Sequence, residues 1–379
     1  MSKTELMVNE QRLVKLFKDL VLINAPALQE KECFDFVRAE LETMGLEVWE
    51  DDAGSQIGGN CNNLIAVLRG NDSSAPKIFF SAHLDTVEPT AGLKLVEKDG
   101  VIYSDGTTIL GADDKAGMAP AIECIRLLQQ HKPAHGDVYL LFSVAEEIGL
   151  KGAFALKIED LGLDFGYVLD TGPPVGSFVN RTATHDKLDI EVIGKPAHSG
   201  KDPEKGINAI VVAAHAISKM KVGRISPETT SNLGIIEGGT ATNVVCPSVR
   251  IWAEARSTNV EELDVQTAHM IECFEQAAAQ FGTVVNIHHD RHYKAYTVPE
   301  ESKVIQIAKR ASEALGLDPV MRTTLGGSDA NAYNAKGVPT IVVATGMDKI
   351  HTHQEFVPIK DLVELTKLCY QIVIEAQKA

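Results

Sequence analysis

The order of hydrophobic and polar positions first shows an alternation of helices and buried strands. Helical spacing of apolar residues occurs over residues 13–22, 31–44 and 115–130. Continuous apolar runs, which predict buried strands, occupy residues 64–68, 78–80, 138–144 and 165–169. Strands that alternate with helices indicate an α/β domain with a largely parallel sheet.

The middle of the chain instead alternates polar and apolar residues, which is typical of strands with one face in solvent. Such strands are predicted over residues 187–193, 233–236, 249–253 and 283–288, with helices over 206–220 and 260–281. This order predicts a small α+β domain with an antiparallel sheet. The α/β pattern resumes near Tyr293. We therefore predict a discontinuous domain over residues 1–178 and 293–379, interrupted by an inserted domain over 179–292.

Net charge argues against some classes of partner, and cysteine usage indicates the cellular compartment. The formal charge of −16, from 36 basic and 52 acidic residues, argues against nucleic acid or an anionic membrane as partner. The six cysteines are scattered without close pairs, which fits a reduced compartment and offers no thiolate zinc motif. The N-terminal residues 1–6 are polar, and no apolar run is long enough to span a bilayer. We expect a cytoplasmic protein.

Acidic residues and histidines follow the predicted strands of the α/β domain. His83 and Asp85 follow the strand over 78–80, adjacent glutamates follow the strand over 138–144, and Asp170 follows the strand over 165–169. Ligands of such sheets gather beyond the carboxyl ends of the strands. Because buried charges are costly unless they are paired or bind a metal, a cation is expected there.

The spacing of these residues suggests different tasks. Alternation places His83 and Asp85 on the same side of a strand, so that one can bind metal while the other orients it. Glu146 and Glu147 point in different directions, which favours one metal ligand and one general base beside a bound water. A carboxylate can bridge two metal ions, and Asp113 is the natural candidate.

Taken singly, each motif also has a structural interpretation. The histidine–aspartate pair fits a capping pair in a loop, Asp113 fits a helix N-cap, and the adjacent glutamates fit a solvated turn. Asp170, His351 and His198 fit residues of ordinary loops. The combination of motifs is more specific than any one of them.

That combination resembles the co-catalytic dinuclear zinc exopeptidase and deacylase family, which includes peptidase T, dipeptidases, glutamate carboxypeptidase and aminoacylases. The resemblance covers nearly the whole chain and is carried by residues 81–86, 110–117, 145–147, 168–170, 196–200 and 351–356. The run Leu-Gly-Ala-Asp-Asp-Lys-Ala-Gly and an aspartate at position 170 are similar to the peptidase T branch. The Pro-Ala-His-Ser-Gly segment and Pro173-Pro174 depart from that branch, and the former has the form of the wider family.

The resemblance implies two zinc ions per subunit, with cobalt or manganese as alternatives. The ligands of one ion would be His83, Asp113 and Asp170, and those of the other Asp113, Glu147 and His351. Residues with catalytic roles would be Glu146 as general base, Asp85 as the residue that orients His83, and His198 as oxyanion donor. Substrate contacts would come from Arg256, Asn243, Gly327 and Ser328. His353 is an alternative ligand, but His351 is preferred because it lies four residues before Glu355.

The implied fold is a zinc-exopeptidase-like catalytic domain with an inserted lid and dimerisation domain. The implied activity is metal-dependent hydrolysis of a peptide bond in short peptides, with release of the N-terminal residue from tripeptides as the specific expectation. Deacylation of N-acyl amino acids, or dipeptidase or carboxypeptidase activity, is the alternative within the same chemistry. A metal-stabilised binding protein is the non-enzyme alternative, although structural zinc sites have no spare base such as Glu146. A homodimer through the inserted domain is expected.

Overall fold

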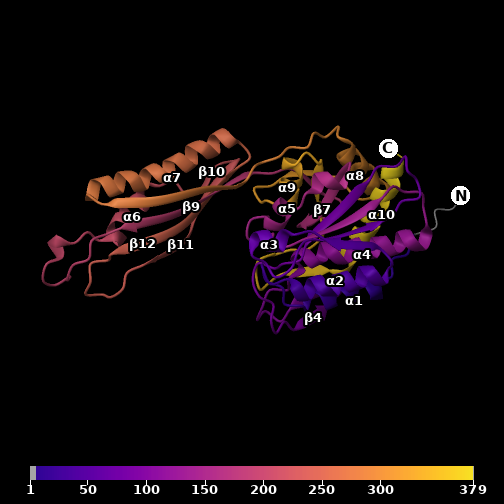
Figure 1. The fold of residues 1–379 in the computed structure, drawn as a ribbon, viewed down its shortest axis with the longest axis horizontal. Helices are drawn as coiled ribbons and strands as arrows, with labels where there is room; N and C mark the ends of the chain where they lie inside the picture. Colours follow the sequence, from indigo (N-terminus) through magenta and orange to yellow (C-terminus); the bar gives the residue numbers. More distant parts are fainter. Residues whose placement is uncertain (1–5, 379) are drawn as a thin grey trace. The chain divides into compact units, whose positions relative to one another are not determined.

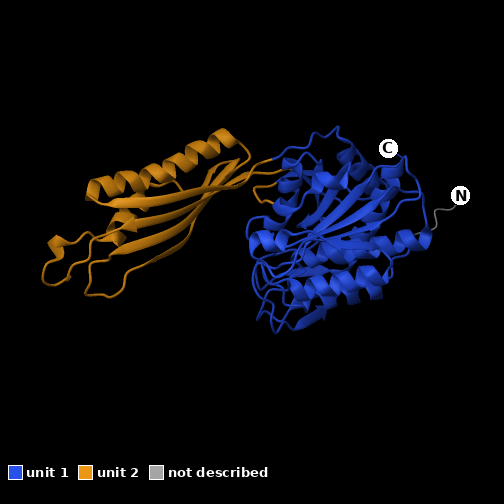
Figure 2. Ribbon diagram, in the orientation of Figure 1, with its two compact units in different colours: residues 1–180, 296–323, 328–379 blue, residues 181–295, 324–327 orange. Residues whose placement is uncertain are grey.

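The chain divides into two compact units, which are coloured separately in Figure 2. A computed structural model describes residues 6–378, so residues 1–5 of the polar N-terminal segment lie outside the described range. Unit 1 comprises Met1–Asn180, Tyr296–Thr323 and Ser328–Ala379, and unit 2 comprises Arg181–Ala295 and Thr324–Gly327. Each unit has its own hydrophobic core.

Unit 1 is built on an eight-stranded mixed sheet with the order β1-β2-β6-β3-β7-β15-β8-β14. The four central strands β6, β3, β7 and β15 run parallel to one another, whereas β1, β2 and β8 pair antiparallel. The strands are β1 Glu47–Glu50, β2 Leu64–Leu68, β3 Ile78–His83, β6 Val138–Ser143, β7 Phe165–Thr171, β8 Phe178–Arg181, β14 Met321–Thr323 and β15 Thr340–Ala344. A separate three-stranded sheet contains β4 Leu95–Lys98, β5 Val101–Ser104 and β16 Phe356–Pro358.

Helices cover both faces of the large sheet (Figure 1). They are α1 Glu10–Val21, α2 Lys31–Thr43, α3 Ala53–Ile57, α4 Ala112–His131, α5 Lys151–Ala155, α8 Lys303–Ala314, α9 Asp329–Ala335 and α10 Ile359–Gln377, with a 3₁₀ turn at Ile158–Leu161. On one face, Phe79 and Ser81 of β3 contact Tyr333 of α9. On the other face, α4 packs against β3 and β7 and is itself covered by α1 and α10. Both faces of the central strands are therefore buried, as their continuous apolar runs predict.

Unit 2 is a five-stranded antiparallel sheet with the order β10-β11-β12-β9-β13. Its elements are β9 Thr184–Ile193, β10 Gly223–Ser226, β11 Thr229–Gly238, β12 Ser248–Ser257, β13 Val284–Tyr293, α6 Ala209–Lys219, α7 Val260–Phe281 and a 3₁₀ turn at Pro203–Lys205. Leu188, Ile190 and Val192 of β9 are fully buried, in the core that α6 and α7 cover. The intervening side chains are exposed or half-buried, so one face of the sheet is open to solvent, as the alternating pattern predicts.

The predicted fold class is confirmed: a mainly parallel mixed sheet flanked by helices, with a separate antiparallel α+β unit. The expected domain boundaries lie close to the ends of the units, but Thr324–Gly327 was expected in the first domain and clusters with unit 2. The backbone explains this difference, because Thr324 N–H donates to the carbonyl of Arg181 at 3.1 Å and Gly327 lies against the ring of Tyr293.

Among residues 6–378, none of the helices has both the length and the apolar character that a membrane crossing requires.

Candidate metal centre

Each of the four parallel strands of unit 1 brings a polar residue to the same edge of the sheet. His83 is the last residue of β3, and Asp170 is the penultimate residue of β7. Glu146 follows β6, and His351 lies in the loop after β15. The carboxyl ends of parallel strands meet at one edge, so these side chains converge although they are far apart in sequence.

Asp113 reaches the same place from the start of α4. The backbone of Asp113 and Asp114 is not helical, with ψ of 108° and 35°, although both lie within the bounds of the helix. Both residues lie before the helix predicted over 115–130. Their side chains are buried and face the cluster instead of capping a helix turn in solvent.

Two groups of three side chains place their ligand atoms within 4.8 Å of one another. They are His83, Asp113 and Asp170, and Asp113, Glu147 and His351. Asp113 belongs to both groups, because its Oδ1 lies 3.1 Å from His83 Nε2 and its Oδ2 lies 3.2 Å from His351 Nε2. A carboxylate whose two oxygens face two different imidazoles has the arrangement of a bridging ligand. All five residues expected as ligands are thus brought together.

His353 belongs to neither group. Its Nε2 lies 2.9 Å from Glu88 Oε1, and its Nδ1 lies 3.2 Å from the carbonyl oxygen of Gly106. Both ring nitrogens therefore face acceptors outside the cluster. The geometry favours His351 over His353, as the spacing does.

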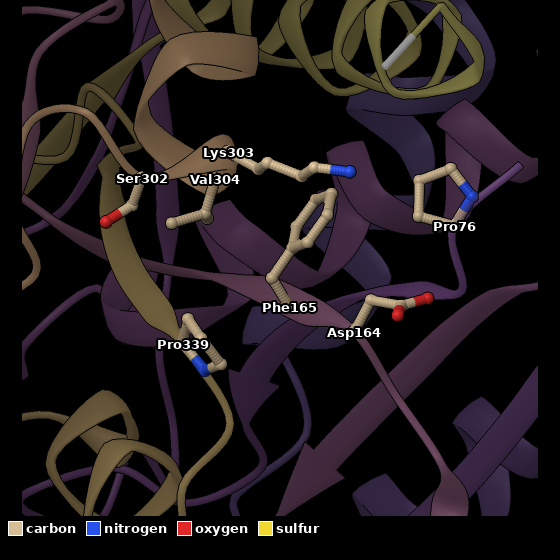
Figure 3. Close-up of a pocket in the computed structure, with 7 residues that line it drawn as sticks. All are labelled: Pro76, Asp164, Phe165, Ser302, Lys303, Val304 and Pro339. Carbon is tan, nitrogen blue, oxygen red and sulfur yellow. The ribbon is translucent and has the colours of Figure 1, made fainter.

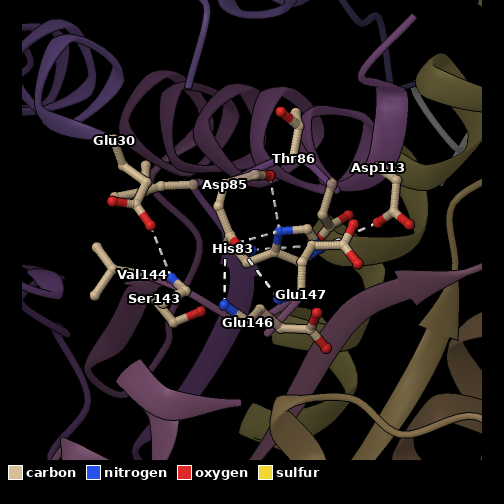
Figure 4. A network of polar contacts seen from close by, with 12 residues as sticks. Glu30, His83, Asp85, Thr86, Asp113, Ser143, Val144, Glu146 and Glu147 are labelled. Atoms are coloured by element: carbon tan, nitrogen blue, oxygen red, sulfur yellow. Dashed lines mark hydrogen bonds and ion pairs between the residues drawn. The ribbon is translucent and has the colours of Figure 1, made fainter. Parts of the chain in front are cut away.

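Asp85 contacts both His83 and the turn after β6 (Figure 4). Its carbonyl oxygen lies 3.0 Å from His83 Nδ1, and because a carbonyl only accepts, Nδ1 carries a proton and donates it in this contact. This arrangement leaves His83 Nε2 directed at the cluster, as in histidines whose second nitrogen binds metal. The carboxylate of Asp85 accepts the N–H groups of Glu146 and Glu147, at 3.0 and 3.1 Å.

Burial, mutual repulsion and hydrogen bonds together set the pKa values of the cluster. Burial, with the charges of Asp113 and Asp114, raises the pKa of Asp170 well above its usual range. Burial alone lowers the pKa of His83, but hydrogen bonds to Asp113 and Asp85 outweigh it and raise this pKa. Carboxylates crowded into a buried site are stable as anions when a cation lies among them. Each group supplies two carboxylates and one imidazole, a donor set that suits divalent zinc. The residues therefore fit a pair of metal ions.

Two buried charged residues support the cluster and were not predicted. Glu355 accepts the N–H groups of Gly111 and Asp113, at 2.7 and 3.0 Å, and burial raises its pKa to about 7. Lys115 donates to the carbonyls of Leu84 and Asp85, at 2.7 and 3.1 Å. Both residues lie in motifs that were singled out, but their partners are backbone atoms of distant segments, which a sequence does not display.

Unit 2 holds most of the residues expected to contact substrate. The backbone of Ser199, next to His198, donates to the carbonyl of Asn243 at 3.0 Å, so these two loops lie side by side. Arg256 on β12 lies 3.1 Å from Glu254, and its Nη1 lies 3.5 Å from the carbonyl of Leu325. Gly327 has no room for a side chain, because a Cβ would lie 2.3 Å from the ring of Tyr293.

Ser328 belongs to unit 1, where it precedes α9 and its N–H donates to Asn331 at 3.2 Å.

A small pocket of unit 1, drawn in Figure 3, lies at the opposite end of the strands from the cluster. Its lining residues are Pro76, Asp164, Phe165, Ser302, Lys303, Val304 and Pro339, which precede or begin β3, β7, β15 and α8. Ligands of parallel sheets bind beyond the carboxyl ends of the strands, where the cluster lies. The pocket is therefore not a candidate for the active site.

Comparison with known proteins connects this geometry to a family. Residues 79–375 match the model of peptidase family M20/M25/M40, a span that includes every residue of the two groups. The chain belongs to this peptidase family. The family expected from the motifs is thereby confirmed, and the chain is a peptidase and hence a hydrolase that acts on peptides.

Three relatives of the family are similar over most of their lengths. Aminopeptidase PepT from Bacillus cereus ATCC 10987 is 41% identical, with a TM-score of 0.86 over 97% of this chain and 99% of that one. A tripeptidase from Staphylococcus aureus subsp. aureus Mu50 is 37% identical, with a TM-score of 0.92 over 98% and 100% of the two chains. Peptidase T from Clostridium perfringens strain SM101 is 28% identical in an alignment 353 positions long, which covers 83% of this chain and 86% of that protein.

Proposed function

We propose that the protein is a dinuclear metal aminopeptidase that releases the N-terminal residue from short peptides, with tripeptides as its substrates. The observation that carries the proposal is Asp113, whose two carboxylate oxygens face His83 and His351 in two adjoining groups of ligand atoms. The names of the relatives from B. cereus and S. aureus, an aminopeptidase PepT and a tripeptidase, support the substrate class.

The two groups would hold two zinc ions, with Asp113 as the shared ligand. Bound there, such ions polarise the scissile carbonyl and lower the pKa of a water. Glu146, buried beside the cluster, accepts a proton from the attacking water and then returns it to the leaving amine. Asp85 keeps the proton of His83 on Nδ1 and thereby keeps its Nε2 available as a ligand.

Unit 2 supplies the remaining groups of the proposal. His198 donates to the oxyanion, Arg256 binds the terminal carboxylate of the peptide through its planar guanidinium, and Asn243, Gly327 and Ser328 contact the substrate. The protein acts as a homodimer through this lid unit, so that His198 serves the site of the neighbouring subunit. Six free, buried cysteines support a reducing, cytoplasmic location as part of the same proposal.

A panel of peptides tests the activity. The zinc-, cobalt- or manganese-loaded protein is assayed on unblocked tripeptides, dipeptides, C-terminally extended peptides and N-acyl amino acids, each with and without a chelator. We expect chelator-sensitive release of the N-terminal residue from tripeptides. The matched control is a tripeptide with an acetylated N-terminus, which an aminopeptidase does not cleave.

The other outcomes of the panel distinguish the alternatives. Activity only on N-acyl amino acids would keep the metal site and make the protein a deacylase of the same family. Release of the C-terminal residue would make it a carboxypeptidase. Chelator-resistant cleavage of tripeptides would contradict the metal-dependent mechanism itself.

A further inference from the structure

Four consecutive backbone N–H groups, those of residues 144–147, each donate to a side-chain oxygen. The first donates to Asn63 Oδ1 at 3.0 Å and the second to Glu30 Oε1 at 2.9 Å. The third and fourth donate to the two carboxylate oxygens of Asp85, at 3.0 and 3.1 Å. Figure 4 shows the contacts that Glu30 and Asp85 make with the turn that follows β6. Side chains from three other segments therefore hold the turn.

This turn needs such support because of its backbone. Strand β6 ends at Ser143, and Ala145 has a φ of 52°, in the left-handed region that residues with a Cβ rarely adopt. Conformations of this kind persist when the surroundings hold them. Successive N–H groups in such a turn also form a concave surface that attracts carboxylates. The turn carries Glu146 and Glu147, so its shape decides where both side chains point.

Glu30 is well placed to hold the turn. It is fully buried at the start of α2, and its Oε1 is shared between the N–H groups of Leu28 and Ala145, each at 2.9 Å. Its other oxygen, Oε2, is buried and makes no hydrogen bond to any described residue. Glu30 therefore holds the turn through a single oxygen, Oε1, at the distance that a glutamate side chain can reach.

The segment that carries Glu30 is itself attached to the chain beyond His83. Thr86 N–H donates to the carbonyl of Ala25 at 3.0 Å, and Thr90 N–H donates to Asn24 Oδ1 at 2.7 Å. Glu30 thus connects two supports of the cluster, the segment after β3 and the turn after β6.

We propose that Glu30 is a positioning residue of the active site, which fixes the turn of Glu146 and Glu147 through the N–H of Ala145. The inference rests on the proposed function, in which Glu146 is the base. For this role Glu30 must supply an acceptor oxygen at this distance, but its negative charge is not needed.

Two variants separate reach from charge. Glu30→Gln keeps the reach and the acceptor oxygen but loses the charge, whereas Glu30→Asp keeps the charge and is one methylene shorter. With a cleaved peptide as substrate, we expect Glu30→Gln to keep kcat within about 3-fold. We expect Glu30→Asp to lose ~10²-fold in kcat at nearly unchanged KM, because displacement of a reacting group by about 1 Å costs this much. Metal content, measured by mass spectrometry, stays at the wild-type level in both.

Hydrogen exchange gives a readout that does not depend on activity. In Glu30→Asp, amides of residues 142–149 exchange faster with solvent, whereas in Glu30→Gln they exchange as in the wild type. In the wild type, the amide of Ala145 exchanges as slowly as those of β6, a measurement that holds even if Glu30→Asp does not fold. If the wild type cleaves no peptide, the proposed function fails while exchange still decides the role of Glu30.

Glu123 offers matched controls. It is equally buried, lies on α4 and binds Arg12 at 2.7 and 2.9 Å, and within residues 6–378 it makes no hydrogen bond or ion pair to the turn. Glu123→Gln and Glu123→Asp should leave kcat and the exchange of residues 142–149 unchanged. The inference is overturned if Glu30→Gln loses as much activity as Glu30→Asp, if Glu30→Asp changes neither kcat nor exchange, or if the wild-type amide of Ala145 exchanges rapidly.

Discussion

Glu146 and Glu147 are neighbours in sequence but lie in different environments. Glu147 Oε1 lies 3.2 Å from His351 Nε2, within one group of candidate ligands. Burial, together with the charges of Asp329 and Glu147, raises the pKa of Glu146 well above its usual range, although His83 opposes the shift. A carboxylate with a raised pKa is a stronger base, so the environment supports the different tasks proposed for the two residues.

Replacement of Glu146 by glutamine tests its proposed role as the general base. Glutamine has nearly the same shape but accepts no proton, so we expect kcat to fall ~10²–10⁴-fold, the range for loss of a general base. Metal stoichiometry, measured on the purified protein, should not change. Glu97→Gln, at an exposed ion pair with Lys18, is the control. Turnover of Glu146→Gln close to that of the wild type would remove Glu146 from this role.

Replacement of Glu355 tests the support of Asp113, the ligand proposed to bridge the two ions. Its two oxygens accept separate N–H groups, so Glu355→Gln places an amide N–H against one of them. We expect metal affinity to fall ~10–100-fold, as for other outer-shell partners, in a competition titration with a chelator. Gln354→Ala, at the exposed neighbouring position, serves as control. Unchanged affinity in Glu355→Gln would show that Asp113 is held without it.

The candidate ligands could be predicted because acids and histidines after buried strands are conspicuous in a sequence. Their supports could not. Glu30, Asn63 and Glu355 act on backbone N–H groups of residues far along the chain, and any acid or amide looks equally able to do so. The turn at Ala145 is also invisible, because an alanine gives no sign of a left-handed backbone.

At the scale of elements, β9 of unit 2 carries an aspartate that joins three of them. Asp186 is fully buried, and its carboxylate accepts from Arg291 of β13 at 2.7 and 2.9 Å and from Thr267 of α7 at 2.9 Å. Burial alone would raise the pKa of Asp186, but these hydrogen bonds and the charge of Arg291 lower it. The aspartate therefore links the sheet to the helix that covers it.

Asp186→Asn should destabilise unit 2. Removal of one partner from a buried ion pair costs about 3 kcal/mol, the lower end of the usual range because Arg291 keeps some contact with solvent. The stability due to Asp186 is present above the ordinary carboxyl pKa of about 3.9 and is lost as the pH falls through the lower folded value. The variant should therefore lose this acid-sensitive part of the unfolding free energy, measured by urea unfolding between neutral and acid pH.

Asp264 provides the control, because it binds the same Arg291 at 2.7 Å from an exposed position. Exposed pairs contribute about 0–1 kcal/mol, so Asp264→Asn should have little effect. Equal effects of the two substitutions would contradict the assignment of a structural role to the buried aspartate.

Long periodic helices and continuous apolar strands were predicted, whereas three-residue strands were not. The helix predicted over 260–281 coincides with α7, and the apolar run over 64–68 coincides with β2. Strands such as β14 and β16 contain three residues each, too few to show a period of two. Their existence depends on distant partners, such as β5 for β16, which sequence alone does not supply.

At the scale of the whole molecule, unit 2 exposes apolar side chains that fit the proposed homodimer. Ile235 and Ile236 of β11 are 54% and 58% exposed, and Ile210 of α6 is 50% exposed. Strand β10 pairs with β11 only up to Ser231, so among the described residues Leu233–Gly238 have no strand partner on that side. Open edges with apolar side chains are typical of contact surfaces.

Ile236→Glu should separate the dimer. A buried charge in the interface is costly, so we expect sedimentation velocity to show a dimer for the wild type and a monomer for this variant. Val265→Glu, at a position of α7 that is 72% exposed, should remain a dimer. A wild type that is a fully active monomer would contradict the dimer and the role of His198 across subunits.

The insertion of unit 2 also orders events on the ribosome. Strand β7 is complete at Thr171, but β15, its neighbour in the sheet, begins only at Thr340. At about 5–20 residues per second, synthesis of the intervening segment takes roughly 10–30 s. During this interval all of unit 2 is synthesised, while one edge of β7 has no strand to pair with until β15 is made. His83, Asp113 and Asp170 are already present, whereas the second group is complete only when His351 is synthesised. If the proposed pair of ions binds, the nascent chain can therefore acquire them one after the other.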